Sequence, residues 1–130
     1  MRNKFVIRLM SLIPCILLGL VSYQWFTDPA TTALGFGIDY EAMSNHGKNS
    51  LFRDFTAFFL GTAIMSFLSF ITKQYQWILS AGIIYLVAAI FNVLTSINYE
   101  TDIAVASLIS EIIFTFMAFT AAFIYKKNNL

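Results

Sequence analysis

Four apolar stretches of about 20 residues each follow one another along this 130-residue chain, and they constrain its fold more than any other feature. A hydrocarbon core about 30 Å thick needs about 20 helical residues at about 1.5 Å each. The sequence therefore predicts an all-α fold, a four-transmembrane-helix bundle in a single membrane domain over residues 1–130. The expected helices are Phe5–Phe26, Leu51–Thr72, Trp77–Ile97 and Ile103–Tyr125.

Composition supports a lipid environment. Hydrophobic residues make up 58% of the chain and charged residues only 12%, about half of the ~25% charged share that is usual in soluble domains. The net charge of +1 argues against a nucleic-acid partner, and a single cysteine, Cys15, excludes an internal disulfide or a cysteine-based metal site. We expect the bilayer itself to be the main partner, and the sequence predicts no metal or cofactor.

The first apolar stretch begins as a secretory signal does, with Arg2 and Lys4 ahead of an apolar run. Its run is longer than a usual signal core, and the residues that follow it lack a small-x-small cleavage site. Pro14 precedes Cys15 where lipoprotein processing would require a small residue. We therefore expect a retained membrane helix, kinked near Pro14.

Charges and aromatic residues predict the orientation. Basic residues remain on the cytoplasmic side, so both termini are expected in the cytoplasm of a bacterial-type plasma (inner) membrane. The unequal number of basic residues on the two sides disfavours dual-topology small multidrug exporters. The basic residues on the terminal side are Arg2, Lys4, Arg8, Lys73, Lys126 and Lys127, against Lys48 and Arg53 on the other, with Arg8 expected to snorkel outward. The acids on the opposite side are Asp28, Asp39, Glu41, Asp54, Glu100 and Asp102. Aromatic residues expected at the membrane interfaces are Tyr23, Trp25, Tyr75, Trp77, Tyr99 and Tyr125.

Glu111 is the one acid that remains inside an apolar stretch, and a carboxyl group at that depth is a candidate functional group. At about 100° per residue, it shares one face with small residues, which permit close helix packing. Glu111 is therefore expected to face the bundle, either as a functional group or as a hydrogen-bonding lock. The small or polar residues on its face are Ala104, Ser107, Thr115, Ala118 and Ala122, and the bulky ones opposite are Ile109, Ile113, Phe116 and Ile124.

Each of the other three helices also has a row of small or polar residues along one face, which we call its stripe. On the third helix, Asn92 shares its face with Ala81, Tyr85, Ala88, Ser96 and Tyr99. On the second, the expected inward arc is Asp54, Ala57, Gly61, Met65 and Ser69, with Phe59, Phe67 and Phe70 toward lipid, and on the first it is Ser11, Cys15, Gly19 and Ser22.

Together these stripes predict a cleft that opens toward the extracytoplasmic side. Glu111 and Asn92 are expected at its floor, Tyr85 in its wall, and Arg53, Asp54 and Tyr99 at its rim. Apolar surroundings would favour a neutral Glu111, whereas Arg53 within reach would favour the charged form; the sequence leaves both open.

The segment RDFTAFFLG, from Arg53 to Gly61, resembles the start of the second helix in a family of small four-helix bacterial membrane proteins of unknown function. Arg53 matches the arginine of that family and Glu111 the acid in its last helix, while Phe55, Thr56 and Ala57 replace a Gly-rich stretch. A more distant resemblance is to DoxX-type membrane proteins. That resemblance implies a four-helix fold rather than a particular function.

The predicted outer loop, Thr27–Ser50, is longer than most connections, and such loops are often functional or partly helical. It is a candidate lid over the cleft. His46, Asp39 and Glu41 lie in it, but one histidine without ligand spacing does not predict a metal site.

Three functions remain open, since the chain contains no nucleophile elbow, phosphate loop, paired cysteines or two-histidine helix motif. The leading hypothesis is a binding protein that holds a small lipophilic molecule through Glu111 and Asn92. The second is a membrane enzyme, an isomerase or cyclase on a lipid-like substrate, with Glu111 as catalytic acid. The third is a proton-coupled transporter subunit, which would need a homo-oligomer to form two gates. Beside these three, a purely structural partner protein also remains open.

Overall fold

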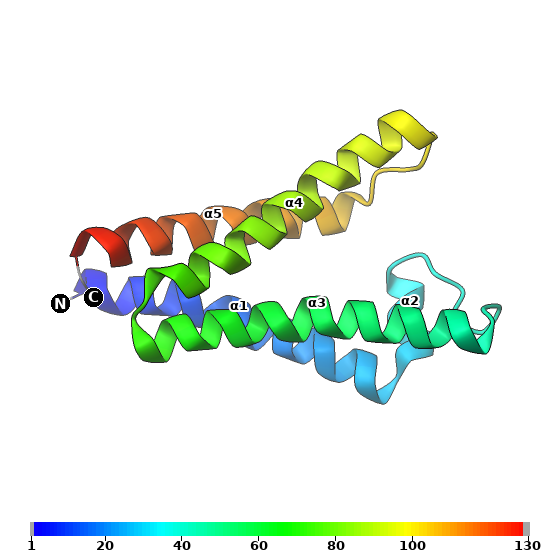
Figure 1. Cartoon of the computed structure of the whole chain (residues 1–130), viewed down its shortest axis with the longest axis horizontal. Coiled ribbons are helices and arrows are strands. Elements are labelled where there is room, and N and C mark those ends of the chain that lie inside the picture. The colour runs from blue at the N-terminus through cyan, green and yellow to red at the C-terminus, as the bar shows by residue number, and fades with distance from the viewer. Residues whose placement is uncertain (1, 129–130) are drawn as a thin grey trace.

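The computed structural model describes residues 2–128, which form five helices and their connections, with no strand among them. Four of the helices are long and apolar enough to cross a membrane, which confirms the predicted all-α four-helix architecture (Figure 1). Residues 1, 129 and 130 of the predicted domain lie outside the described part of the chain. The helices are α1 (Arg2–Thr27), α2 (Pro29–Gly35), α3 (Asn45–Thr72), α4 (Tyr75–Tyr99) and α5 (Val105–Asn128).

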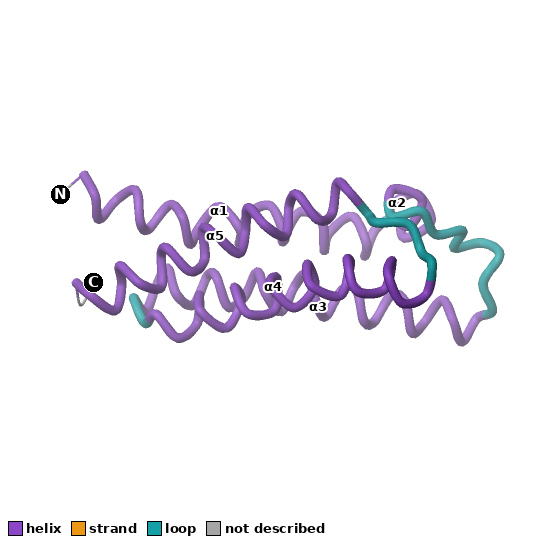
Figure 2. Tube along the Cα trace, turned by 90° about the horizontal axis from the view of Figure 1, so that it is seen from above, coloured by secondary structure: helices purple, strands orange, loops and turns teal. Residues whose placement is uncertain are grey.

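The long helices form two pairs, because α1 packs mainly against α3 and α4 mainly against α5. The pairs lie close together at the end that carries both termini and the short α3–α4 connection, and they spread apart toward the opposite end (Figure 1). At that spread end, the loops on either side of α2 and between α4 and α5 connect the helices (Figure 2). We call it the splayed end.

The predicted loop over residues 27–50 is largely helical. Asp28 caps α2 by accepting a hydrogen bond from the Thr31 amide at 3.2 Å, and Pro29 occupies the first turn, where a missing N–H costs nothing. Ser44 likewise accepts from the Gly47 amide at 3.0 Å. This cap starts α3 at Asn45, six residues before the expected Leu51.

Small residues let α4 and α5 approach closely. Ala118, Ala121 and Ala122 of α5 are buried against Ile78 of α4. A Cβ atom on Gly82 would lie only 2.8 Å from the Phe119 ring and 2.9 Å from the Ala118 Cβ, so this position has room only for hydrogen.

The predicted inward faces of α1 and α5 are largely confirmed. Ser11 and Ser22 of α1 are buried. On α5, Ala118 and Ala122 are buried, whereas the predicted lipid-facing Ile109, Ile113 and Phe116 are exposed. Ile124, expected on the lipid side, instead packs half-buried against the core.

The predicted inward face of α3 is only partly right. Ser69 is buried, Met65 packs against the core and Phe67 is exposed, all as expected. The other buried residues of the helix, Thr62, Ala63 and Ser66, did not belong to the expected arc. Ala57 is exposed, and Phe59, expected toward lipid, packs against other aromatic rings inside the splayed end. Apolar residues surround this helix almost evenly, so the periodicity of the sequence did not indicate which face is buried.

Two aromatic residues expected at the membrane interfaces are buried instead. Trp25 is 0% exposed because Phe36 and Phe55 pack against its ring. Tyr125 is 2% exposed and shares a 3.0 Å hydrogen bond with Ser11, which joins α5 to α1. Tyr23 and Tyr99 are exposed, as an interfacial position requires.

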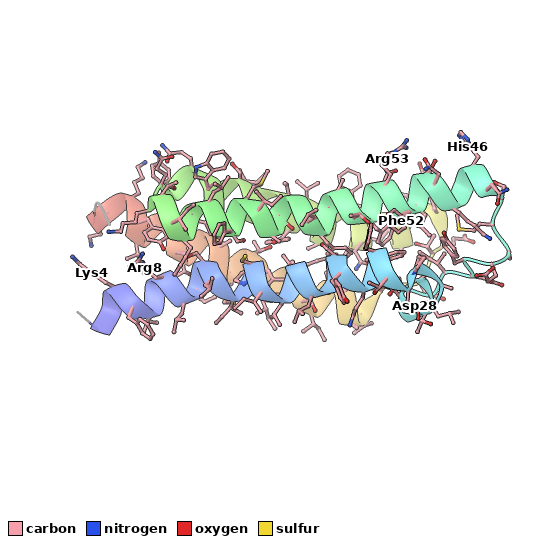
Figure 3. The ribbon with its side chains drawn as sticks, turned by 90° about the horizontal axis from the view of Figure 1, so that it is seen from below. Lys4, Arg8, Asp28, His46, Phe52 and Arg53 are labelled. Atoms are coloured by element: carbon pink, nitrogen blue, oxygen red, sulfur yellow. The ribbon has the colours of Figure 1, made fainter. Side chains whose placement is uncertain are left out.

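Charged residues are unevenly divided between the two ends. Lys4 and Arg8 lie toward the end with the termini, and Asp28, His46 and Arg53 toward the splayed end (Figure 3). Arg8 does not simply extend outward, because its guanidinium lies 5.1 Å from the centroid of the Phe70 ring. The structure thus supports the predicted segregation of charge.

Candidate ligand-binding cleft

Two adjoining cavities occupy the splayed end. The larger has a volume of about 610 Å³ and the smaller about 330 Å³, which falls within the ~300–1,000 Å³ of typical ligand pockets. They share part of their lining, so we treat them together as the outer cleft. The residues common to both are Gly35, Phe36, Phe58, Phe59, Ala106, Ser107 and Glu111.

Aromatic rings form one wall of the outer cleft. Phe55, Phe58 and Phe59 are three and four residues apart and therefore lie on one side of α3. Phe36, just after α2, completes the group, with its ring centroid 5.5 Å from Phe55 and 5.8 Å from Phe59. Trp25 packs behind them, 4.8 Å from Phe55. We call Phe36, Phe55, Phe58 and Phe59 the aromatic wall.

Glu111 stands opposite this wall and lines both cavities. The residue is half-buried, and its Oε2 atom is buried without a hydrogen-bond partner. A buried oxygen left unsatisfied costs about 1–3 kcal/mol, and more when charged. Glu111 can therefore gain from any hydrogen-bond donor that enters the cleft. Its expected position toward the bundle is confirmed.

Asn92 has a structural task that the sequence did not indicate. Its Nδ2 donates to the Ala104 carbonyl at 3.0 Å, and its Oδ1 accepts from the Ala104 amide at 3.0 Å. Ala104 directly precedes α5, and its carbonyl also accepts from the Leu108 amide. Asn92 thus fixes the start of α5 to α4. It lines the larger cavity, and its amide lies close enough to interact with Glu111.

Tyr85 and Asp54 also reach the outer cleft. Tyr85 is 1% exposed, lines the smaller cavity, and packs 5.6 Å from Phe114. Its hydroxyl lies near those of Thr62 and Ser66. Asp54 lines the larger cavity, although its side chain is 70% exposed.

Two expected rim residues lie outside the cavity lining. The Arg53 Nε is 3.2 Å from Asp54 Oδ1, and its side chain is 66% exposed; it extends from the side of α3 away from α1 (Figure 3). Tyr99 is 76% exposed near the C-terminal end of α4. The structure therefore brings together Glu111, Asn92, Tyr85 and Asp54, but neither Arg53 nor Tyr99.

Sequence reasoning missed the aromatic wall. The spacing of Phe55, Phe58 and Phe59 was visible, but it is equally common on helix faces that contact lipid. Phe36 was expected among the loop residues that dip into the membrane interface, but its place beside Trp25 depends on how α2 folds back toward α1.

The splayed end shows no grouping of metal ligands. Within residues 2–128, no cluster of three or more His, Cys, Asp or Glu side chains is placed to hold a metal ion, and His46 is exposed.

The resemblance to small four-helix bacterial membrane proteins and to DoxX-type proteins stays a prediction. No protein-family model, curated protein sequence or solved structure matches the chain.

Proposed function

We propose that this multi-pass membrane protein binds a small lipophilic molecule in the outer cleft, with Glu111 as the polar group that orients the ligand. The observation that carries the proposal is the combination of an apolar cavity with a carboxyl oxygen, Glu111 Oε2, that is buried and has no partner. Ligand pockets typically pair apolar walls with a few such convergent polar groups.

The proposed setting is a bacterial-type plasma membrane, with both termini in the cytoplasm and the outer cleft on the extracytoplasmic side. Lys73, Lys126 and Lys127 support this orientation because they follow or end helices on the terminal side of the bundle, and basic residues favour the cytoplasmic side. The enzyme and transporter hypotheses also begin with a ligand at Glu111. A test of binding therefore tests their first requirement.

Native mass spectrometry of the detergent-extracted protein tests the proposal. We expect the wild-type protein to retain a lipophile as a discrete added mass. Ala88→Phe should abolish this retention, because Ala88 lines the larger cavity and the added ring would fill it. Glu111→Gln should weaken retention by about 10-fold or more, since a hydrogen bond to a charged group contributes about 1.5–3 kcal/mol.

Glu100→Gln is the matched control, because Glu100 is an exposed acid outside the cavity lining. It should retain the lipophile as the wild type does. An equal loss in Glu100→Gln and Glu111→Gln, or undiminished retention in Ala88→Phe, would contradict binding in the outer cleft.

A further inference from the structure

The charges around the outer cleft have one sign. Asp54 and Glu111 are the only ionisable acids or bases in the described lining of the two cavities, apart from the phenol of Tyr85. Two basic residues of the splayed end lie outside the lining and are paired. Arg53 pairs with Asp54 at an exposed position, so Glu111 is the unpaired acid of the lining, and the Lys48 Nζ lies 3.6 Å from Glu41 Oε2 and 5.2 Å from the Tyr40 ring. An anionic ligand would find no basic side chain in the described lining.

One oxygen of the Glu111 carboxyl group has no protein donor. The Asn92 amide lies within reach of the carboxyl group, but Oε2 stays without a partner, and Asn92 Nδ2 already donates to the Ala104 carbonyl. Ser110, on the same helix, donates to its own backbone at Ala106. Because Oε2 remains unsatisfied, a ligand that supplies an N–H or O–H would satisfy it.

The aromatic wall favours a positive donor over a neutral one. The faces of aromatic rings carry partial negative charge and attract ammonium groups by about 0.5–2 kcal/mol, more when water is excluded. A carboxylate opposite several phenyl rings therefore suits a cation with an apolar body. An alcohol would satisfy Glu111 but gain nothing from the ring faces.

We infer that the ligand of the outer cleft is a lipophilic amine in its protonated form. This inference rests on the proposed function and narrows its ligand class. The ammonium group binds Glu111 at the junction of the two cavities, and the apolar body packs along Phe36, Phe55, Phe58 and Phe59.

The test compares decylamine, decanol and decanoate, which share an apolar chain and differ in the charge of the head group. Each is equilibrated at pH 7 with phosphatidylcholine nanodiscs that contain the protein, and retention in protein-free nanodiscs is subtracted. We expect decylamine to bind about 10-fold more tightly than decanol, from the ion pair and the ring faces together. Decanoate should show no retention above the protein-free discs.

Two variants test which residues cause the preference for decylamine over decanol. Glu111→Gln should remove most of the preference for decylamine, because it should weaken decanol binding less than decylamine binding: a neutral amide still accepts a hydrogen bond from the alcohol but forms no ion pair with the amine. Phe36→Leu keeps an apolar side chain but removes a ring, and should lower the preference about 3-fold. Phe91→Leu is its control, because Phe91 is 58% exposed and outside the cavities.

The outcomes separate the two proposals. Decanol bound as tightly as decylamine, with both blocked by Ala88→Phe, overturns the amine inference and leaves lipophile binding intact. Preferential binding of decanoate would also overturn the amine inference and leave lipophile binding intact. If no member of the series is retained above the protein-free discs, both proposals fail for this ligand size. An unchanged preference in Phe36→Leu and Glu111→Gln also overturns the inference.

Discussion

Asn92 connects α4 to the beginning of α5 by two hydrogen bonds with the backbone of Ala104, both 3.0 Å long. Ala104 lies in the connection between α4 and α5 at the splayed end. The Asn92 side chain therefore helps to fix where α5 begins. It also positions Ser107 and Glu111, one and two turns further on, relative to the aromatic wall.

Asn92→Ala should destabilise the protein by about 1–3 kcal/mol, because both hydrogen bonds are lost together. The decrease is measured as a lower midpoint of chemical unfolding in mixed micelles, accompanied by faster amide exchange at Leu108. Asn98→Ala is the matched control, since Asn98 is an exposed residue of the same helix. If both variants unfold at the same midpoint, the bonds to Ala104 contribute nothing measurable.

At the level of single residues, the sequence indicated which side chains face the bundle better than it indicated which groups they contact. Glu111 was expected to face the bundle, and it does, because it is half-buried, lines both cavities and shares its face of α5 with the buried Ala118 and Ala122. The bond from Asn92 to Ala104 could not be expected, since it depends on the path of the loop between them. Trp25 and Tyr125 resembled interfacial residues until Phe36 and Ser11 were placed beside them.

Contacts between elements depend on how closely two helices can approach. At Gly82, the α4 backbone lies so near Phe119 and Ala118 that any side chain would force the helices apart. Gly61 of α3 has no atom within 4 Å of the corresponding position, although it also lies inside a membrane helix. Gly82 therefore permits a close contact between two helices, whereas Gly61 faces open space.

Gly82→Ala should destabilise the protein by about 1–3 kcal/mol, the usual cost of overpacking. Gly61→Ala should be neutral or stabilise it by up to about 1 kcal/mol, because alanine is the better helix former. Thermal unfolding of the two variants in the same detergent provides the measurement. Equal stability would show that α4 and α5 tolerate a wider separation than the structure has.

Periodicity predicted the faces of α5 but not those of α3, and the reason lies in their composition. On α5, alanines and isoleucines alternate with helical spacing, so one side is small and the other bulky. On α3, small residues and large apolar residues are mixed around the helix, so no side is purely small or purely bulky. Near the splayed end, contacts with Phe36 and Trp25, which lie outside the helix, help to place Phe55 inside the bundle.

The whole molecule has two distinct ends, one compact and one splayed. The compact end carries both termini and the connection Lys73–Gln74, where Lys73 adopts a left-handed conformation with φ 60° and its amide bonds to the Ser69 carbonyl. The splayed end carries α2 and most of the acids. Basic residues favour the cytoplasmic side of a membrane, so the unequal charge of the two ends predicts how the protein is oriented in the bilayer.

Single-cysteine labelling tests this orientation. In a Cys15→Ala background, which removes the one native cysteine, His46→Cys should react with a membrane-impermeant maleimide in intact cells. Lys127→Cys should react only after the cells are permeabilised. Both positions are exposed in the structure, so access depends on the side of the membrane alone. The reverse labelling pattern would place the outer cleft in the cytoplasm.

The length of α3 sets the depth of the outer cleft. Its 28 residues extend about 42 Å, roughly 12 Å more than a hydrocarbon core of about 30 Å. With Thr72 at one boundary of that core, the opposite boundary falls near Arg53 and Asp54, and the turns before them stand in the headgroup layer. A molecule that diffuses within the leaflet at the splayed end would thus meet Asp54 while its head group is still hydrated, and would shed that water only on reaching Glu111.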